Sequence, residues 1–66
     1  MQVTYTVKNY AGVKNQDHNS TMDFEMVRKN LQAAGCTLNL DKLEEAVSYG
    51  FGVIIDEFQI EIRLVR

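Results

Sequence analysis

One cysteine and one histidine are all that this chain of 66 residues offers for an internal cross-link. A single cysteine cannot close an intramolecular disulfide, and one cysteine with one histidine cannot complete a four-ligand structural zinc site. Chains of this size usually need a disulfide framework, a structural metal or a partner subunit. The sequence therefore predicts one small domain, residues 1–66, stabilised by helices packed on a sheet or by association with another chain.

Acidic residues are concentrated in one part of the chain. The net charge is −2, from nine acidic and seven basic residues. This charge gives no overall basic field that would attract nucleic acid. A solvated helix face explains the acidic stretch most simply, and an acidic patch for a basic partner is the alternative. Between residues 41 and 57 only Lys42 opposes five carboxylates, which are Asp41, Glu44, Glu45, Asp56 and Glu57.

The compartment is indicated by three features of the sequence. No apolar run approaches the roughly 18 residues that a membrane span needs. Residues 1–4 have neither the basic nor the apolar region of a signal peptide. A lone thiol fits a reducing environment. We therefore expect a soluble, cytoplasmic protein of a bacterial or host cell.

Three segments have the alternating pattern of β-strands. Residues 2–8 alternate apolar and polar side chains, residues 52–55 contain a short apolar run, and residues 58–65 alternate most regularly. The wholly polar segment 14–20 predicts a loop, and Ala11–Gly12 predicts a turn or bulge. Asp56–Glu57 predicts a turn between the last two strands, although a single strand with a bulge at Asp56 is the alternative.

Two segments have the apolar spacing of helices. The first is predicted at 22–34, with Ser20 or Thr21 as its N-cap and Gly35 at its end. The second is predicted at 41–49, where Asp41 and Glu44 have capping-box spacing and Gly50 follows as a stop. The first helix has the apolar stripe Phe24, Val27, Leu31 and Ala34, and the second buries Leu40, Leu43, Ala46 and Val47.

The order of these elements is strand, helix, helix, strand, strand. Two amphipathic helices on one face of a small antiparallel sheet would bury every apolar stripe. The predicted fold class is therefore α+β.

Catalytic and metal-binding residues are weakly represented. A nucleophilic pair of Cys36 and His18 would need the two side chains within hydrogen-bond reach, and a loop histidine with a small packing cysteine is the simpler interpretation. Asp17, His18 and Asp23 match no established metal-ligand spacing. We therefore predict no enzyme, no catalytic, cofactor-binding or metal residues, and no cofactor.

Two segments weakly suggest nucleic-acid binding. Residues 50–55, Gly-Phe-Gly-Val-Ile-Ile, partly match the strand motif of RNA-recognition domains, but Tyr49 replaces its basic residue and Val53 its second aromatic. Residues 22–49 have the layout of a helix-turn-helix, although the second helix would bring carboxylates to the phosphates. A small dimeric DNA-binding regulator is therefore the alternative function.

Protein binding has better support. Met22, Met26 and Ala33 lie away from the apolar stripe of the first helix, where they are either an adaptable binding surface or a second buried face. Residues 58–65 would let two copies pair if that strand lay at a sheet edge. The residues predicted for self-association are Phe58, Ile60, Ile62 and Leu64. Those predicted for partner binding are Met22, Met26, Glu44, Glu45, Tyr49, Asp56 and Glu57.

The sequence thus predicts a non-catalytic, protein-binding module that occupies the surface of another protein, and that forms a homodimer if the strand at 58–65 is an edge. In size and acidic character it resembles the small inhibitors that phages and mobile elements direct against host defence proteins, such as anti-CRISPR proteins. We therefore expect another protein as the partner, and no membrane.

Overall fold

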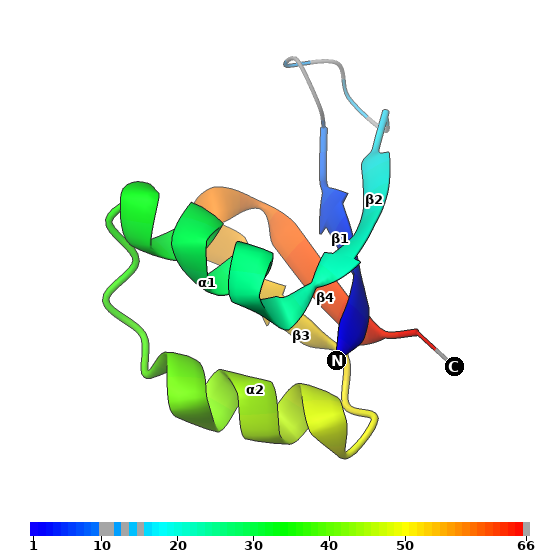
Figure 1. Cartoon of the computed structure of the whole chain (residues 1–66). Coiled ribbons are helices and arrows are strands. Elements are labelled where there is room, and N and C mark those ends of the chain that lie inside the picture. The colour runs from blue at the N-terminus through cyan, green and yellow to red at the C-terminus, as the bar shows by residue number, and fades with distance from the viewer. Residues whose placement is uncertain (10–11, 13, 15, 66) are drawn as a thin grey trace.

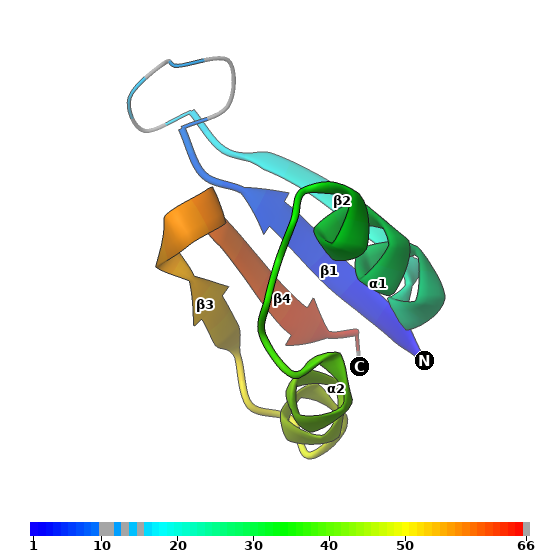
Figure 2. The ribbon, with the colours of Figure 1, turned by 90° about the vertical axis from the view of Figure 1, so that its left-hand side faces the viewer.

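The computed structural model describes residues 1–9, 12, 14 and 16–65. Their order is β1 (Gln2–Val7), β2 (His18–Asp23), α1 (Phe24–Ala33), α2 (Leu40–Ser48), β3 (Val53–Ile55), the 3₁₀ turn η2 (Asp56–Phe58) and β4 (Ile60–Leu64). The strands form one antiparallel sheet in the order β2-β1-β4-β3, and both helices pack on the same face of it (Figures 1 and 2). The predicted α+β class is confirmed.

The sheet consists of two hairpins joined in the middle. One hairpin is β1 with β2, the other is β3 with β4, and the β1–β4 pairing joins them with Val3 opposite Leu64 and Tyr5 opposite Ile62. Alternation then directs Val3 and Ile62 toward the helices, and both are fully buried. Residues of the opposite parity, such as Thr4 and Arg63, line the face that no helix covers.

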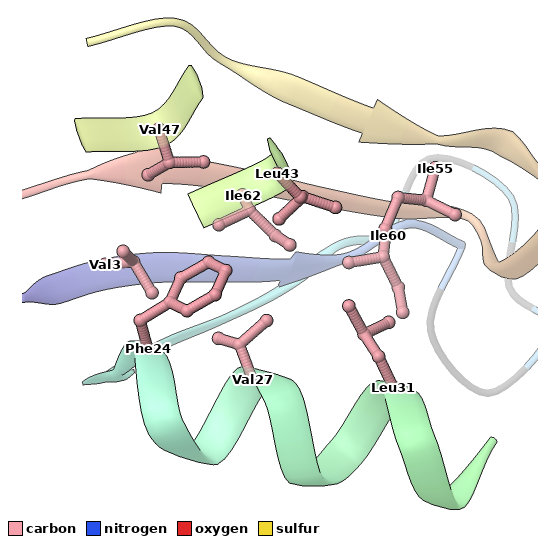
Figure 3. Close-up of a cluster of buried hydrophobic side chains, with 9 residues drawn as sticks. All are labelled: Val3, Phe24, Val27, Leu31, Leu43, Val47, Ile55, Ile60 and Ile62. Atoms are coloured by element: carbon pink, nitrogen blue, oxygen red, sulfur yellow. The ribbon is translucent and has the colours of Figure 1, made fainter. Parts of the chain in front are cut away.

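The core lies between the sheet and the two helices. The apolar stripe of each helix supplies part of it, as the sequence predicts, although Ala34 is exposed. Figure 3 shows these side chains pointing toward one another from α1, α2 and three strands. The buried apolar residues are Val3, Phe24, Val27, Leu31, Leu43, Val47, Ile55, Ile60 and Ile62.

Strand β2 corrects the prediction of a loop at 14–20 and of a helix beginning at residue 22. Residues 18–20 belong to β2, and so does Met22, which lies opposite Val3. The segment is polar because β2 is an edge strand, with one side solvated and only Ser20, Met22 and Asp23 partly covered. Residue 15 of the predicted loop and Ala11 of the predicted turn lie outside the described residues.

The helix starts also differ from the prediction. Asp23, not Ser20 or Thr21, is the N-cap of α1. Asn39, not Asp41, caps α2, and its side-chain Oδ1 accepts the backbone N–H of Asp41 at 3.0 Å. Because Asn39 is the cap, α2 begins at Leu40, one residue earlier than predicted, and Leu40 is half-buried.

The predicted end of α1 at Gly35 is confirmed. Gly35 has a φ of 82°, and the N–H of Cys36 donates to the carbonyl of Leu31 at 2.9 Å. This is the Schellman arrangement, in which a residue in the left-handed region lets the chain satisfy the last carbonyls of a helix. Glycine takes that conformation without steric cost.

Strand β4 lies inside the sheet, between β1 and β3. The prediction that two copies pair through 58–65 required an edge strand, and that requirement is not met. Ile60 and Ile62 are buried in the core, and Phe58 and Leu64 are half-buried against it. The connection from β3 is the turn η2 followed by Gln59 at a φ of 55°, and not a bulge within one strand.

A polar contact joins the two helices. The guanidinium of Arg28 in α1 donates to Oδ1 of Asp41 at 2.7 Å and to Oε1 of Glu44 at 2.5 Å, both on α2. The same guanidinium lies 5.6 Å from the ring centre of Phe24. These two carboxylates raise the pKa of Arg28 above its usual range. The contact holds α2 beside α1, and it partly neutralises the acidic helix.

A second polar contact ties the start of β1 to the end of β2. The α-amino group of Met1 lies 2.9 Å from Oδ1 of Asp23, and the carbonyl of Met1 accepts the N–H of Phe24. The hydrogen bond between the two charged groups raises the pKa of the amino group and lowers that of the Asp23 carboxyl.

Replacing Gly35 by alanine should destabilise the fold by about 1 kcal/mol, because only the backbone conformation opposes the new methyl group. No atom lies within 4 Å of the position that a Cβ at Gly35 would take. Urea denaturation measures the change, and Gly35→Asn should lose less. Gly52→Ala is the control, since its Cβ would make only ordinary contacts with Arg63. An equal loss in both variants would contradict the explanation.

The contact between Met1 and Asp23 should stabilise the 66-residue chain only between two pH limits. The lowered pKa of Asp23 gives stability that is complete above about pH 4 and is lost as the pH falls through the folded-state pKa. The raised pKa of the amino group gives stability that is complete below about pH 8 and is lost as the pH rises through its folded-state pKa. The difference in unfolding free energy between the wild type and Asp23→Asn should therefore shrink on both sides.

Denaturation series at several pH values measure this difference. Asp41→Asn is the matched control, because its partner Arg28 keeps its charge at alkaline pH. The effect of Asp41→Asn should therefore not shrink above about pH 8. An Asp23→Asn effect that stays constant into alkaline solution would contradict a role for the amino group.

Candidate protein-binding surface

The structure separates the two methionines predicted to form one patch. Met22 lies in β2 and is half-buried, and its Sδ is 3.8 Å from Nδ2 of Asn30. Met26 lies on α1 with 48% of its surface exposed, and Ala33 is also exposed. The interpretation of a second buried helix face therefore fails for Met26 and Ala33, while Met22 packs against the core.

The predicted acidic residues also lie on different elements. Glu44 is half-buried and paired with Arg28, whereas Glu45 is exposed on α2. Asp56 and Glu57 are exposed in η2. This turn follows β3, at the end of the strand that is away from α2. Figure 2 shows η2 and α2 at opposite ends of β3. The structure does not bring these four carboxylates together.

Large exposed apolar side chains occur instead in β3 and in the segment that leads into it. Tyr49 is 73% exposed, Phe51 64% and Ile54 63%. They come from the C-cap of α2, the connection that follows, and the middle of β3. Together with the outer edge of β3 we call them the β3 margin. Because α2 packs on one face of the sheet and Ile54 points toward the other, these side chains border the β3 edge from both faces.

Local geometry explains why two aromatic side chains are held at this position. Gly50 has a φ of 93°, and the N–H of Phe51 donates to the carbonyl of Ala46 at 3.1 Å. This is the same Schellman arrangement as at Gly35, so the predicted stop at Gly50 is confirmed. It turns the chain from α2 directly into β3 and fixes the backbone of Phe51 next to the strand.

Ile54 is exposed because β3 alternates across the sheet. Ile55 points toward the helices and is buried, and Ile54 points toward the uncovered face opposite Glu61 of β4. The backbone of β3 pairs with β4 on one side, and no strand of the described chain covers its other side.

The two sheet edges differ in how they are protected. The outer strand β2 is polar throughout except at Met22. The outer strand β3 is Val53-Ile54-Ile55, without a charged residue or proline to discourage pairing. Proteins usually blunt an exposed edge with very short strands, charges, proline or bulges, and of these β3 has only its length of three residues. The β3 edge is therefore the one that can accept another strand.

The charges around the margin come from three elements. The Nε of Arg63 in β4 donates to Oε2 of Glu61 at 2.9 Å. The Arg63 side chain lies over Gly52, because a Cβ on Gly52 would be 3.6 Å from the Nε of Arg63. Asp56 makes no ion pair with another described residue. On α2, residues 42, 46 and 49 lie on the side opposite Glu44, by the spacing of about 100° per residue.

The remaining predicted chemistry has no assembled site in the described part of the chain. Cys36 is half-buried beside the core, and His18 is exposed at the start of β2. Among the described residues no three His, Cys, Asp or Glu side chains come together, and no pocket opens. No described helix is both long enough and apolar enough to cross a membrane.

Phe51 and Ile54 were missed as candidate site residues, whereas Tyr49 was included. The run Val53-Ile54-Ile55 reads as a buried strand, but a strand with only one covered face must turn its middle residue outward. Phe51 was interpreted only within a weak RNA-binding motif. The exposure of both follows from the place of β3 at the edge of the sheet, which the sequence pattern does not show.

Comparison with known proteins found no match: neither a family model, nor a curated protein, nor a solved structure corresponds significantly to this chain.

Ile54 should contribute little to folding, although its neighbours in the core contribute much. Ile54→Thr should change the unfolding free energy by less than about 0.5 kcal/mol, because the side chain is already mostly in water. Ile62→Ala, at a fully buried position, should cost about 2–5 kcal/mol. Urea denaturation at low protein concentration compares the two. A large loss for Ile54→Thr would mean that this residue serves the fold and not a surface.

Proposed function

We propose that this chain is a non-catalytic protein-binding module that associates with another protein chain through the β3 margin. The observation that carries the proposal is the exposure of Tyr49, Phe51 and Ile54, each more than half in water, in and next to a strand edge that no described strand covers. Occupying a surface of another chain in this way is also how a small inhibitor of a host defence protein acts.

The energetics support a protein as the ligand. Full burial of one large apolar side chain contributes about 1.5–3 kcal/mol, so three such residues can anchor an interface. Tyrosine and phenylalanine are enriched at protein interfaces, and tyrosine is frequent among the residues that dominate binding energy. An open strand edge adds backbone hydrogen bonds, which give orientation as well as affinity.

The alternative of a DNA-binding regulator has no observation in its favour. The helix that would read DNA is α2, and its first turns carry Asp41, Glu44 and Glu45. The nearby Arg28 is already engaged by two of these carboxylates. Phosphates would be repelled by such a surface. DNA binding stays a prediction from the sequence that nothing in the structure favours.

Affinity capture tests the proposal. The tagged wild type should retain a defined protein from lysate of its native host, and the double variant Tyr49→Ser/Phe51→Ser should retain at least about tenfold less, as expected when interface anchors are lost. The control is Leu38→Ser, which removes another exposed apolar side chain, 52% exposed, away from the margin. Circular dichroism establishes that each variant is folded.

Purified components then separate the outcomes. Calorimetry with the retained protein should give weaker binding for the margin variant and unchanged binding for the control. Equal binding by the wild type and the double variant would overturn the role of the margin. Tight, steeply salt-dependent binding to generic duplex DNA would favour the alternative function.

A further inference from the structure

The outer edge of β3 has unused hydrogen-bonding groups. In an antiparallel ladder, successive residues direct their N–H and C=O groups to alternate sides of the strand. Pairing with β4 uses one set of these groups in Val53–Ile55, and the other set points away from the sheet. A strand that lies antiparallel to β3 would satisfy them.

A second copy of this chain matches that edge in one register. A two-fold axis perpendicular to the sheet keeps each side chain on its own face, so paired residues must have the same parity. Centring the axis on Ile54 places Ile54 against Ile54 of the second copy, and Val53 against Ile55. Apolar residues then meet on both faces, and the most exposed isoleucine is covered.

The charges next to β3 are complementary in the same register. Asp56, which directly follows β3 and begins η2, comes next to Gly52 of the second copy, and the Arg63 side chain of that copy lies over this glycine. Asp56 has no ion pair within the described chain, and two of the five donors of Arg63 point toward Glu61. The two-fold axis makes this contact twice.

We propose that β3 pairs antiparallel with β3 of a second copy, centred on Ile54, to form a continuous eight-stranded sheet with two Asp56–Arg63 ion pairs across the interface. This inference rests on the proposed function, because it names the chain that the β3 margin binds. Of the carboxylates on α2, the exposed Glu45 lies on the side of Tyr49, about 40° from it by helical spacing. Asp41 and Glu44 are directed toward Arg28 of α1, while residues 42, 46 and 49 lie on the opposite side.

Sedimentation equilibrium of the 66-residue chain, from about 1 µM to about 1 mM, tests the pairing. The wild type should approach a dimer as concentration rises, and Ile54→Lys should stay monomeric. Asp56→Arg and Arg63→Asp should each raise the dimer dissociation constant at least about tenfold, because each puts like charges together. The double variant Asp56→Arg/Arg63→Asp should restore dimerisation. Glu57→Arg, which makes the same charge change one residue away, should have little effect.

A cross-link provides a second test, which also detects a weak dimer. Paired residues in an antiparallel ladder have Cα atoms about 4.5 or 5.5 Å apart, which is within the range of a disulfide. The variant Cys36→Ser/Ile54→Cys should therefore oxidise to a covalent dimer, and Cys36→Ser/Glu57→Cys should do so much more slowly. Circular dichroism establishes that all variants are folded.

The outcomes distinguish this inference from the proposed function. A wild type that stays monomeric at about 1 mM, with no faster cross-linking through residue 54, would overturn the pairing. If the wild type is monomeric but captures a protein that Tyr49→Ser/Phe51→Ser does not, the proposed function stands, with a different protein bound at the β3 margin. A dimer that is insensitive to the charge reversals would overturn the register. If capture is unchanged and no dimer forms, both proposals fall.

Discussion

The pairing of β1 with β4 is the contact on which the rest of the structure depends. It brings the two ends of the sequence together and places Val3 and Ile62, both fully buried, at the centre of the sheet. Each hairpin by itself would be a two-stranded ribbon, which is marginal in water. Joined, they form a sheet wide enough for both helices, with α1 packed over β1 and β2 and α2 packed over β3 and β4.

That arrangement also determines which surfaces remain open. With the helices on one face and β1 and β4 in the middle, the uncovered parts are the polar face and the edge strands β2 and β3. The polarity of β2 protects one edge, and the short apolar β3 leaves the other available. The Schellman turn at Gly50 adds Phe51 beside that edge. The β3 margin therefore results from the sheet order and from a helix stop that leads directly into a strand.

Much of the fold could be predicted from the sequence, because an element that is buried on one side has apolar residues at a regular spacing. The helix stripes, the glycine stops and the alternation of β1 and β4 all follow from one-sided burial. Strand β2 could not be found in this way, since an edge strand with polar residues has the composition of a loop. The predicted helix caps are wrong because Ser, Thr, Asp and Asn are all favoured at the N-cap position. Propensity alone therefore does not choose Asp23 over Thr21, or Asn39 over Asp41. Of the candidate site, only Tyr49 was foreseen, because the exposure of Phe51 and Ile54 depends on the order of strands, which spacing alone does not encode.

The division of the sheet into two hairpins has a consequence for how the chain folds. Each hairpin is formed by segments close in sequence, whereas β1 and β4 must meet across nearly the whole chain. Closing such a long loop is entropically costly, and non-local pairing of this kind slows folding. We therefore expect the central pairing to form late, after the local hairpins and helices. Until it forms, the apolar edge of β4 and that of β3 are both open, and an encounter between two chains can occur while the sheet is incomplete. Folding rates of substitutions at Val3 and in the β3–β4 hairpin would show whether the central pairing belongs to the transition state.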